Sequence, residues 1–426
     1  MRILVIGRGG REHAIIWSLQ KSARVKEIYC APGNAGIAEI AECVPIDEQS
    51  FEELGQFAID FAIDLVVVGP EDPLFNGAVD HFERLGIPAY GPRKNAAIIE
   101  GSKVFTKQLL KKYKIPTAEY ESFERYDEAR EYLFRQQAPI VIKADGLAAG
   151  KGVTVAQTLE EADEALKAIM VDKVFGDAGS QVVIEEFLHG QEMSILAFVD
   201  GETVRPMVPA QDHKPIFDGD LGPNTGGMGT YSPVPHIRQS IVDEAIETII
   251  KPTARAMVQE GRPFRGVLFA GLMINEHGPK TIEFNCRFGD PETQVVLPQL
   301  KTDLIDIFVA SVNGRLNDME ISWSEETAVC VVLASGGYPG PYKKGILIEG
   351  LDQVKQSIVF HAGTANQSGA IVTNGGRLLG VTALGKDIAE ARSKAYADIA
   401  HIRYEGKQYR TDIALKALQA AELMNK

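Results

Sequence analysis

The sequence has few cysteines, and none of the four stands in a Cys-x-x-Cys pair. Zinc sites and disulfide frameworks usually need that spacing or more cysteines, so Cys30, Cys43, Cys286 and Cys330 are expected to be core or sheet residues in a reducing compartment. The chain also lacks an apolar run of membrane-spanning length and a secretion signal at its start. We therefore expect a cytoplasmic protein without a membrane partner.

Positive charge is scarce as well. The 426 residues include 44 Lys and Arg against 58 Asp and Glu, which gives a formal net charge of −14. A duplex-binding surface needs clustered positive charge for its phosphate contacts, so no nucleic-acid partner is expected. A chain of this length has room for more than one domain and for a large core.

Short apolar strands alternate with helices through the first 100 residues. Strands are predicted at 2–6, 26–30 and 65–68, with a helix at 14–20 after the first strand. This rhythm indicates a doubly wound parallel sheet, on which ligands bind beyond the carboxyl ends of the strands.

A complete dinucleotide-binding signature is missing from the first glycine turn. Glu12 stands where that signature needs a third glycine, and no acidic residue follows the second strand. Both departures count against a nicotinamide-dependent oxidoreductase. The bare N–H groups of Gly9 and Gly10 favour a simple phosphate instead. A tight turn without a ligand is the alternative.

The segment TIEFNCRFGDPETQ, residues 281–294, carries the most informative pattern. Side chains alternate between the two faces of a strand, so one face receives Phe284, Cys286 and Phe288 and the other receives Glu283, Asn285 and Arg287. Carboxylate and amide oxygens suit Mg²⁺, and a guanidinium suits a carboxylate or a phosphate. This face predicts a metal–phosphate site, although a polar strand edge would have the same composition.

The residues on either side of this strand extend the prediction. The apolar run 267–274 predicts a buried strand that turns at 275–278 and forms a hairpin with the polar strand. Asp290 suits a helix N-cap and Pro291 a first helical position. We therefore expect a helix that starts there, directs its N-terminal N–H groups at the same site, and continues through residue 312.

A second signal lies in PIVIKADGLAAGKGVTV, residues 139–155. A strand ends in Lys143, and a loop follows with glycines at 146, 150 and 152 and with Lys151. Glycines allow backbone N–H groups to approach phosphates closely, so this loop and Lys143 are predicted to bind nucleotide phosphates. It is not a P-loop, because a strand rather than a helix follows. The alternative is a plain hairpin with a flexible tip.

Two further segments carry weaker signals. In the connector near residues 185–192, backbone groups are predicted to pair with an adenine edge and Glu192 with ribose hydroxyls, although an ordinary connection would look the same. The Gly- and Pro-rich segment 210–233 is expected to lack regular structure and to be a binding loop. His213 within it is more often structural than catalytic.

Residues 327–426 predict a small α+β unit. A strand is expected near 327–334, a hairpin at 371–384 around Asn374-Gly375-Gly376, and a helix at 387–403. No residue pattern there indicates chemistry, so the unit is interpreted as scaffold.

Taken together, these motifs resemble the phosphoribosylamine–glycine ligases of the ATP-grasp superfamily. The resemblance covers essentially the whole chain. It rests on GGREHA (9–14), APGNAG (31–36), VGPE (68–71), EGSKVFTK (100–107), VIKADGLAAGKGV (141–153), DGDLGPNTGGMG (218–229) and RFGDPETQ (287–294). Two residues depart from the family pattern: Arg8 replaces the usual Asn, and Pro215 replaces the usual Arg.

The resemblance implies a fold and a reaction. It implies an N-terminal βαβ substrate-binding domain (1–100), an ATP-grasp domain (101–325) whose part 120–190 covers the nucleotide and moves, and a C-terminal α+β domain (326–426). The implied reaction joins glycine to 5-phosphoribosylamine with ATP, through an acyl phosphate, in purine synthesis. The cofactors would be ATP and Mg²⁺ or Mn²⁺, and the protein is expected to be a monomer.

The resemblance also implies roles for individual residues. Glu283 and Asn285 would hold the metal, and Arg287 and Lys143 would act in catalysis. ATP would contact Lys103, Lys143, Gly150, Lys151, Gly152, Glu185, Glu186, Leu188 and Glu192. The substrates would contact Gly9, Gly10, Glu71, Asp212, Lys214, Asn224, Thr225, Gly226 and Arg287. The alternatives are an ATP-grasp ligase with other substrates and a nucleotide-binding regulator without catalysis.

Overall fold

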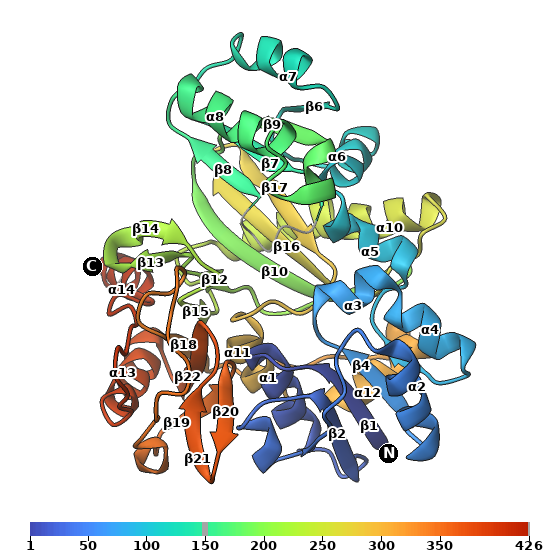
Figure 1. Cartoon of the computed structure of the whole chain (residues 1–426), viewed down its shortest axis with the longest axis vertical. Helices are drawn as coiled ribbons and strands as arrows, with labels where there is room; N and C mark the ends of the chain where they lie inside the picture. Colours follow the sequence, from blue (N-terminus) through green and yellow to red (C-terminus); the bar gives the residue numbers. More distant parts are fainter. Residues whose placement is uncertain (147–151, 425–426) are drawn as a thin grey trace.

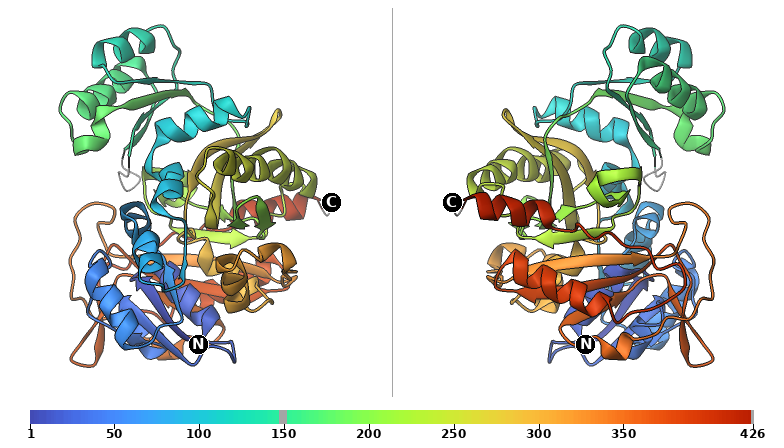
Figure 2. Two further views of the ribbon diagram at one scale, coloured as in Figure 1. Left: turned by 90° about the vertical axis from the view of Figure 1, so that its right-hand side faces the viewer. Right: turned by 90° about the vertical axis from the view of Figure 1, so that its left-hand side faces the viewer.

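A computed structural model describes residues 1–146 and 152–424 of the chain. The chain is a multidomain α/β protein with an N-terminal parallel sheet, a central part built on two antiparallel sheets and a C-terminal part (Figure 1). The three parts surround a common centre, where the segment after β17 passes between the N-terminal and C-terminal sheets (Figures 1 and 2).

The N-terminal sheet confirms the predicted βαβ rhythm. Its parallel strands follow the order β3-β2-β1-β4-β5. They are β1 (Arg2–Gly7), β2 (Glu27–Pro32), β3 (Glu42–Cys43), β4 (Leu65–Val68) and β5 (Ala89–Tyr90). The helices of this part are α1 (Gly10–Leu19), α2 (Phe51–Asp60), α3 (Glu71–Asn76), α4 (Ala78–Arg84) and α5 (Lys94–Gly101), and α6 (Lys103–Lys112) leads on to the central part. Helix α1 starts four residues before the predicted position, because the glycine turn itself forms its first turn.

Two antiparallel sheets form the central part. The first has the order β11-β10-β16-β17, with β10 (Gln191–Asp200), β11 (Thr203–Pro206), β16 (Arg265–Asn275) and β17 (Gly278–Asn285). Helices α9 (Gln239–Ala245) and α10 (Lys251–Gln259) precede β16. The second sheet has the order β6-β9-β7-β8, with β6 (Tyr120–Phe123), β7 (Ile140–Ala144), β8 (Val153–Ala156) and β9 (Val182–Glu186).

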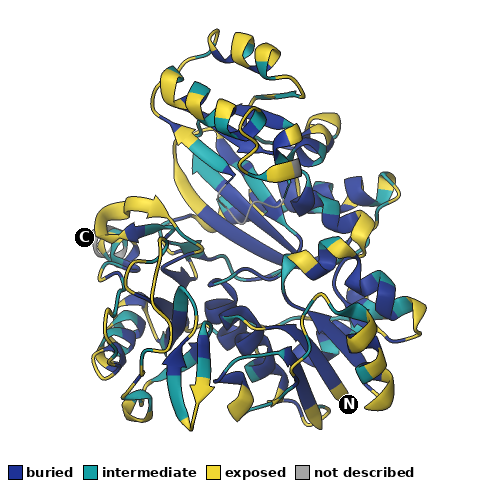
Figure 3. Cartoon of the chain, in the orientation of Figure 1, coloured by how far each residue is buried: buried dark blue, intermediate teal, exposed yellow. Residues whose placement is uncertain are grey.

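Residues 120–190, here termed the covering subdomain, have a core of their own. Helices α7 (Tyr126–Leu133) and α8 (Leu159–Met170) bury residues such as Leu133 and Leu166 against Ile142 and Ile184. The outer faces of both helices are exposed, whereas the central strands β10 and β16 are buried (Figure 3). A separate core is what a part that moves as one body requires, and that motion remains a prediction.

The C-terminal sheet follows the order β12-β15-β18-β22-β19. Its later strands are β18 (Thr327–Ala334), β19 (Ser357–His361) and β22 (Arg377–Gly385), and helices α13 (Ile388–Ile399) and α14 (Leu415–Met424) follow. The predicted hairpin at 371–384 is wrong. Strand β21 (Ala370–Thr373) pairs with β20 (Thr364–Gln367), whereas β22 pairs with β18 and β19. The turn residues Asn374-Gly375-Gly376 correctly predicted a strand on either side, but they do not specify which strand each one pairs with.

The prediction of an irregular loop at 210–233 is also wrong. The segment contains β12 (Gln211–Asp212), β13 (Pro215–Phe217), β14 (Leu221–Asn224) and β15 (Gly229–Ser232). Strand β15 pairs with β18, about a hundred residues later in the chain. The buried side chain of Arg410 donates a hydrogen bond to the Pro215 carbonyl at 3.1 Å and so anchors β13. These distant partners order a stretch whose composition by itself favours turns.

The single helix predicted from Asp290 to residue 312 is two shorter ones. Helix α11 (Thr293–Val296) runs into a 3₁₀ turn at Leu297–Gln299, and α12 (Leu304–Val312) follows after a break. Asp290 and Pro291 are joined by a cis peptide bond and precede α11, so they are not its N-cap and first residue. A four-residue helix has only a small dipole. The described residues 290–296 therefore do not form the anion-binding helix N-terminus that was expected.

Candidate active site

The strand predicted to carry the metal ligands alternates as expected. Phe284, Cys286 and Phe288 are buried, whereas Glu283, Asn285 and Arg287 are half-buried on the other face. A β-bulge precedes them, since Gly271 pairs with Glu283 and Leu272 pairs with Thr281. The bulge leaves Ile282 without a register partner, and its carbonyl accepts a hydrogen bond from Lys143 Nζ at 3.2 Å. Strand β7 of the covering subdomain is thereby connected to β17.

The Glu283 carboxylate is available to a cation. None of the described residues donates a hydrogen bond to it or lies within ion-pair distance. Burial raises the pKa of Glu283, but Lys214, Lys143 and Lys103 lower it further, so the net pKa lies below its ordinary value. An ionised carboxylate without a bonded partner, in a cationic surrounding, fits a metal bound together with phosphate oxygens.

Asn285 supplies the second hard oxygen on this face. Its Nδ2 donates a hydrogen bond to Glu100 Oε1 at 3.0 Å, so its Oδ1 is directed away from Glu100. Opposite Glu283 on β16 is Gly271, which adds no acidic group. Among the described residues no group of three or more His, Cys, Asp or Glu could hold a metal. The oxygens of Glu283 and Asn285 are hard donors of the kind that a divalent cation takes together with phosphate and water oxygens.

A buried ion-pair cluster lies beside β17. Lys107 and Lys143 both pair with Glu185, and all three side chains are nearly fully buried. Burial raises the pKa of Glu185, but Lys143 and Lys107 lower it below its ordinary value. Lys107 Nζ also donates to Thr117 Oγ1 at 2.8 Å. The predicted contact of Lys143 with phosphate would therefore share its ammonium group with Glu185.

Around the glycine-rich loop, Lys103 Nζ donates a hydrogen bond to the Gly146 carbonyl at 3.0 Å. Asp145 accepts from the Ser102 hydroxyl and from Val104 N–H, so the start of α6 and the end of β7 are bound together. Gly150 and Lys151, two predicted ATP contacts, lie outside the described residues. Gly152, which directly precedes β8, lies within the described residues. Its carbonyl accepts a hydrogen bond from Ala144 N–H at 2.8 Å.

The connector between β9 and β10 faces the same region. Glu186 is exposed and accepts from Glu119 N–H at 3.1 Å and from Lys280 Nζ at 2.9 Å. Leu188 is half-buried. Glu192 forms an ion pair with Lys214 at 3.4 Å, so the predicted ribose ligand lies next to a predicted substrate ligand.

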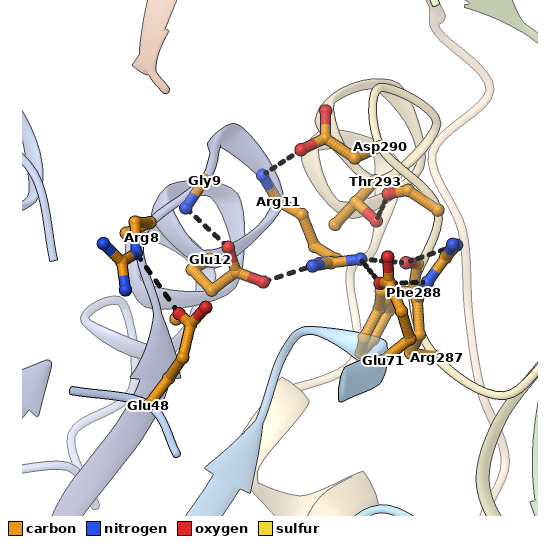
Figure 4. A network of polar contacts seen from close by, with 12 residues as sticks. Arg8, Gly9, Arg11, Glu12, Glu48, Glu71, Arg287, Phe288, Asp290 and Thr293 are labelled. Atoms are coloured by element: carbon orange, nitrogen blue, oxygen red, sulfur yellow. Dashed lines mark hydrogen bonds and ion pairs between the residues drawn. The ribbon is translucent and has the colours of Figure 1, made fainter. Parts of the chain in front are cut away.

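The predicted glycine turn holds an internal carboxylate. Gly9 N–H donates to Glu12 Oε2 at 2.6 Å, and Arg11 Nε contacts Glu12 Oε1 at 2.5 Å (Figure 4). Glu12 fills the space under the turn, because a Cβ on Gly7 would lie 2.5 Å from its Cγ and a Cβ on Gly9 2.8 Å from its Oε2. A phosphate that uses Gly9 N–H would therefore have to displace Glu12. Arg8, the first family departure, points to Asp47 and Glu48 instead.

An ion-pair chain links this turn to residues 283–287, here termed the metal strand because they carry the predicted metal ligands (Figure 4). Arg11 Nη1 donates to the Phe288 carbonyl at 3.2 Å and lies 3.6 Å from Glu71 Oε2. The same Glu71 oxygen accepts from Arg287 Nε at 3.0 Å. Arg287, predicted as a clamp for an anion, is thus already in contact with carboxylates of the N-terminal part.

Acid titration of Glu71 gives a first testable prediction. Burial raises the pKa of Glu71, but Arg287 and Arg11 lower it further, to about 2 from an ordinary 4.5. A depressed native pKa stabilises the fold above the unfolded pKa, and this contribution is lost as pH falls through the native value. We expect an upper limit of about 3 kcal/mol at neutral pH, less the screening of the exposed third of the side chain.

Thermal unfolding of the parent protein and Glu71→Gln between pH 7 and pH 3 measures this contribution. The difference in unfolding free energy should shrink as the pH falls below about 4.5, because protonated glutamate and glutamine carry the same charge. A difference that stays constant with pH would contradict the assignment.

Asp212 ends β12, and Lys214 directly precedes β13, within the segment 210–233 that was expected to be an irregular loop. Burial and the neighbouring Glu292 raise the pKa of Asp212 well above its ordinary value. The Lys214 carbonyl accepts two hydrogen bonds from Thr225, from N–H at 2.8 Å and from Oγ1 at 2.7 Å. Asn224 is exposed at the end of β14. His213 is buried with its ring against the Gly229 carbonyl, which agrees with a structural role.

The C-terminal part was interpreted as scaffold, but its strand β22 carries Arg377, which contacts two predicted site segments. Its Nη1 donates to the Gly226 carbonyl at 2.7 Å and to the Asp290 carbonyl at 2.8 Å. The same nitrogen lies 3.4 Å from Asp290 Oδ1. Arg377 therefore joins the predicted substrate loop to the segment that follows the metal strand.

Comparison with known proteins now adds to this geometry. Family models of phosphoribosylglycinamide synthetase match the chain in three consecutive pieces: the N domain at residues 1–100, the ATP-grasp (A) domain at 101–293 and the C domain at 328–416. The chain belongs to the phosphoribosylglycinamide synthetase family. The sequence resemblance is thereby confirmed.

Related proteins align with this chain over almost its whole length. The phosphoribosylamine–glycine ligase of Caldanaerobacter subterraneus subsp. tengcongensis is 52% identical over 414 residues, which cover 97% of this chain and 99% of that protein. The ligase of Vibrio parahaemolyticus is 50% identical over 423 residues, which cover 98% and 99%.

Solved structures agree with the fold. The crystal structure of phosphoribosylamine–glycine ligase from Thermotoga maritima matches with a TM-score of 0.87 at 36% identity and covers 97% of this chain and 100% of that one. A biotin carboxylase domain from Hydrogenobacter thermophilus matches with a TM-score of 0.73 at 13% identity over 98% of both chains, a likeness of fold alone. Within residues 1–146 and 152–424, no helix has the length and apolarity needed to cross a bilayer.

In this synthetase-family chain, sequence reasoning missed three charged residues of the site. Glu100 and Lys107 lie in the motif EGSKVFTK, which was recognised only as a family marker. Arg377 stands in a strand without any motif. Each is buried or half-buried and contacts a predicted site residue. A buried charge with a specific partner is a functional signal, but it becomes visible only when the partner is known.

Proposed function

We propose that this chain joins glycine to 5-phosphoribosylamine with the hydrolysis of ATP, giving glycinamide ribonucleotide, ADP and phosphate. The observation that carries the proposal is the consecutive match of all three family domains, with Glu283 and Asn285 side by side among the site's lysines. We further propose that the protein acts as a cytoplasmic monomer, with domains at 1–100, 101–325 and 326–426.

We propose two chemical steps. A carboxylate oxygen of glycine attacks the γ-phosphorus of ATP, the bond to ADP breaks, and a glycyl phosphate forms. The amine of the sugar then attacks the acyl carbon, phosphate leaves with the former carboxylate oxygen, and the amine loses a proton. Such phosphoryl transfer depends on positioning and on neutralisation of charge, so it needs no nucleophile from the protein.

The predicted ATP contacts retain their roles in this proposal. Lys103 and Lys143 would contact phosphates together with the loop that ends at Gly152, and Glu185, Glu186, Leu188 and Glu192 would surround the nucleoside. A divalent cation, Mg²⁺ or Mn²⁺, held by Glu283 and Asn285, supplies positive charge to the phosphate oxygens when bound. Burial lowers the pKa of Lys214, but Glu192, with which it pairs at 3.4 Å, and Glu283 raise it further, so its net pKa lies above the ordinary value and a positive charge is held close to the proposed phosphate site.

The amino sugar and glycine are assigned to the same face, beyond Asn285, where Arg287 lies and residues 288–291 follow. Glu71, Asp212, Thr225 and Gly226 would surround the sugar, with Asn224, Gly9 and Gly10 at the margin. Arg287 would steady a carboxylate or the transferred phosphoryl group. Its existing contacts with Glu71 and Glu100 reduce the number of N–H groups it offers.

An assay with labelled glycine tests the proposal. ADP release should require both glycine and freshly made phosphoribosylamine. With ¹⁸O in the glycine carboxylate, one labelled oxygen should appear in the released phosphate, because that oxygen bridges carbon and phosphorus in glycyl phosphate. ADP release without glycine would contradict the proposed substrate, and unlabelled phosphate would contradict the acyl phosphate.

A further inference from the structure

The metal strand is held by a carboxylate from another domain. Glu100 lies in the last turn of α5, and its side chain is 6% exposed. Its Oε1 accepts from Asn285 Nδ2 at 3.0 Å, and its Oε2 accepts from Cys286 N–H at 2.7 Å. Arg287 Nη2 lies 3.0 Å from Oε1 as an ion pair. One buried carboxylate thus contacts three consecutive residues of the strand.

These contacts determine which end of the Asn285 amide faces the site. A backbone N–H and a guanidinium can only donate, so both Glu100 oxygens must act as acceptors. The Asn285 group that faces Glu100 is therefore the NH₂ donor. Its carbonyl oxygen then points away from Glu100, on the face of the strand that also carries Glu283. An amide reversed about its axis would offer the metal an NH₂ group, which cannot be a ligand.

We propose that Glu100 is a positioning residue for the divalent cation: it holds Asn285 with the carbonyl oxygen towards the metal. The inference rests on the metal assignment of the proposed function. Side chains that orient metal ligands typically change metal affinity by about 10- to 100-fold when they are replaced. Glu283 has no bonded partner among the described residues, so the prepared geometry of the site depends on Asn285.

Metal binding itself, rather than turnover, tests this proposal. Mn²⁺ is titrated into the full-length protein with a non-hydrolysable ATP analogue, and free Mn²⁺ is followed by electron paramagnetic resonance. We expect Glu100→Gln to weaken Mn²⁺ binding by at least about tenfold, with the binding of the ATP analogue in the absence of metal unchanged. Binding of Mn²⁺ within twofold of the parent would overturn the proposal.

A control variant and a double variant distinguish a positioning role of Glu100 from a general disturbance of the structure. Glu71→Gln removes another carboxylate from the same Arg287 but does not touch Asn285, so Mn²⁺ binding should stay within about threefold. The double variant Glu100→Gln/Asn285→Asp reverses the hydrogen bond and should recover most of the affinity. If Glu100→Gln fails to fold, the double variant decides: an affinity as low as that of Asn285→Ala would overturn the proposal.

The outcome is independent of the substrates. Because the titration contains neither glycine nor the amino sugar, a failed ligase assay with an intact Glu100 effect would refute the proposed reaction alone. A normal ligase assay with Mn²⁺ binding unaffected by Glu100→Gln would refute only the positioning role.

Discussion

Glu283→Gln is expected to lower the turnover number by at least about 10³-fold while the melting temperature changes little. The substitution removes one negative charge and hardly any volume. In the folded protein Glu283 accepts no hydrogen bond from a described residue and lies within ion-pair distance of none, so its replacement breaks no direct polar contact. Under the proposed function, what is lost is a metal ligand next to the transferred phosphoryl group, where electrostatic stabilisation is typically worth about 3–4 kcal/mol or more.

Steady-state assays of ADP release and thermal unfolding measure the two parts of this expectation. The control is Glu276→Gln, on the turn between the same two strands, whose side chain is 87% exposed. It changes the net charge equally but should leave turnover within about twofold, because exposed charges contribute little. Parent-like turnover of Glu283→Gln would refute the metal assignment.

Arg377→Met is expected to lower kcat/KM for phosphoribosylamine by about 10²- to 10³-fold, with KM for ATP changed less than about threefold. Arg377 is the only described side chain that donates to both the Gly226 and the Asp290 carbonyls. Truncating one partner of a buried, hydrogen-bonded charge pair typically costs about 2–5 kcal/mol. The two segments it joins flank the proposed sugar site rather than the nucleotide.

Initial-rate measurements with each substrate varied in turn separate these effects. Arg403→Met, an exposed arginine of the same domain, is the control and should leave all three KM values unchanged. Equal losses for ATP and for the amino sugar would show that Arg377 supports the whole site rather than the sugar side. A folded variant with parent-like kinetics would refute its role.

The metal strand shows how far local sequence can lead. Alternation of Phe284, Cys286 and Phe288 with Glu283, Asn285 and Arg287 was predicted from a period of two and is confirmed by their burial. The bulge at Ile282 was not predicted, because it depends on how β17 meets β16. That bulge exposes the carbonyl that Lys143 contacts.

Longer-range partners account for the errors. The hairpin segments between residues 211 and 232 are ordered by β18 and Arg410, both from the C-terminal part. The strands on either side of Asn374 pair with different neighbours, although the turn chemistry favours a hairpin. In each case the turn-forming residues were recognised correctly, but pairing with a strand far along the chain determined the final structure.

The sequence by itself determined the parallel N-terminal sheet, the polar face shared by Glu283, Asn285 and Arg287, and the family to which the chain belongs. These follow from periodicity and from contiguous motifs, which are local properties. Only the tertiary structure decided that Glu100 contacts Asn285, that Glu12 occupies the glycine turn and that Arg377 reaches the Gly226 carbonyl. The energy of a buried charge depends on its partner, and separation along the chain does not reveal which residues folding brings together.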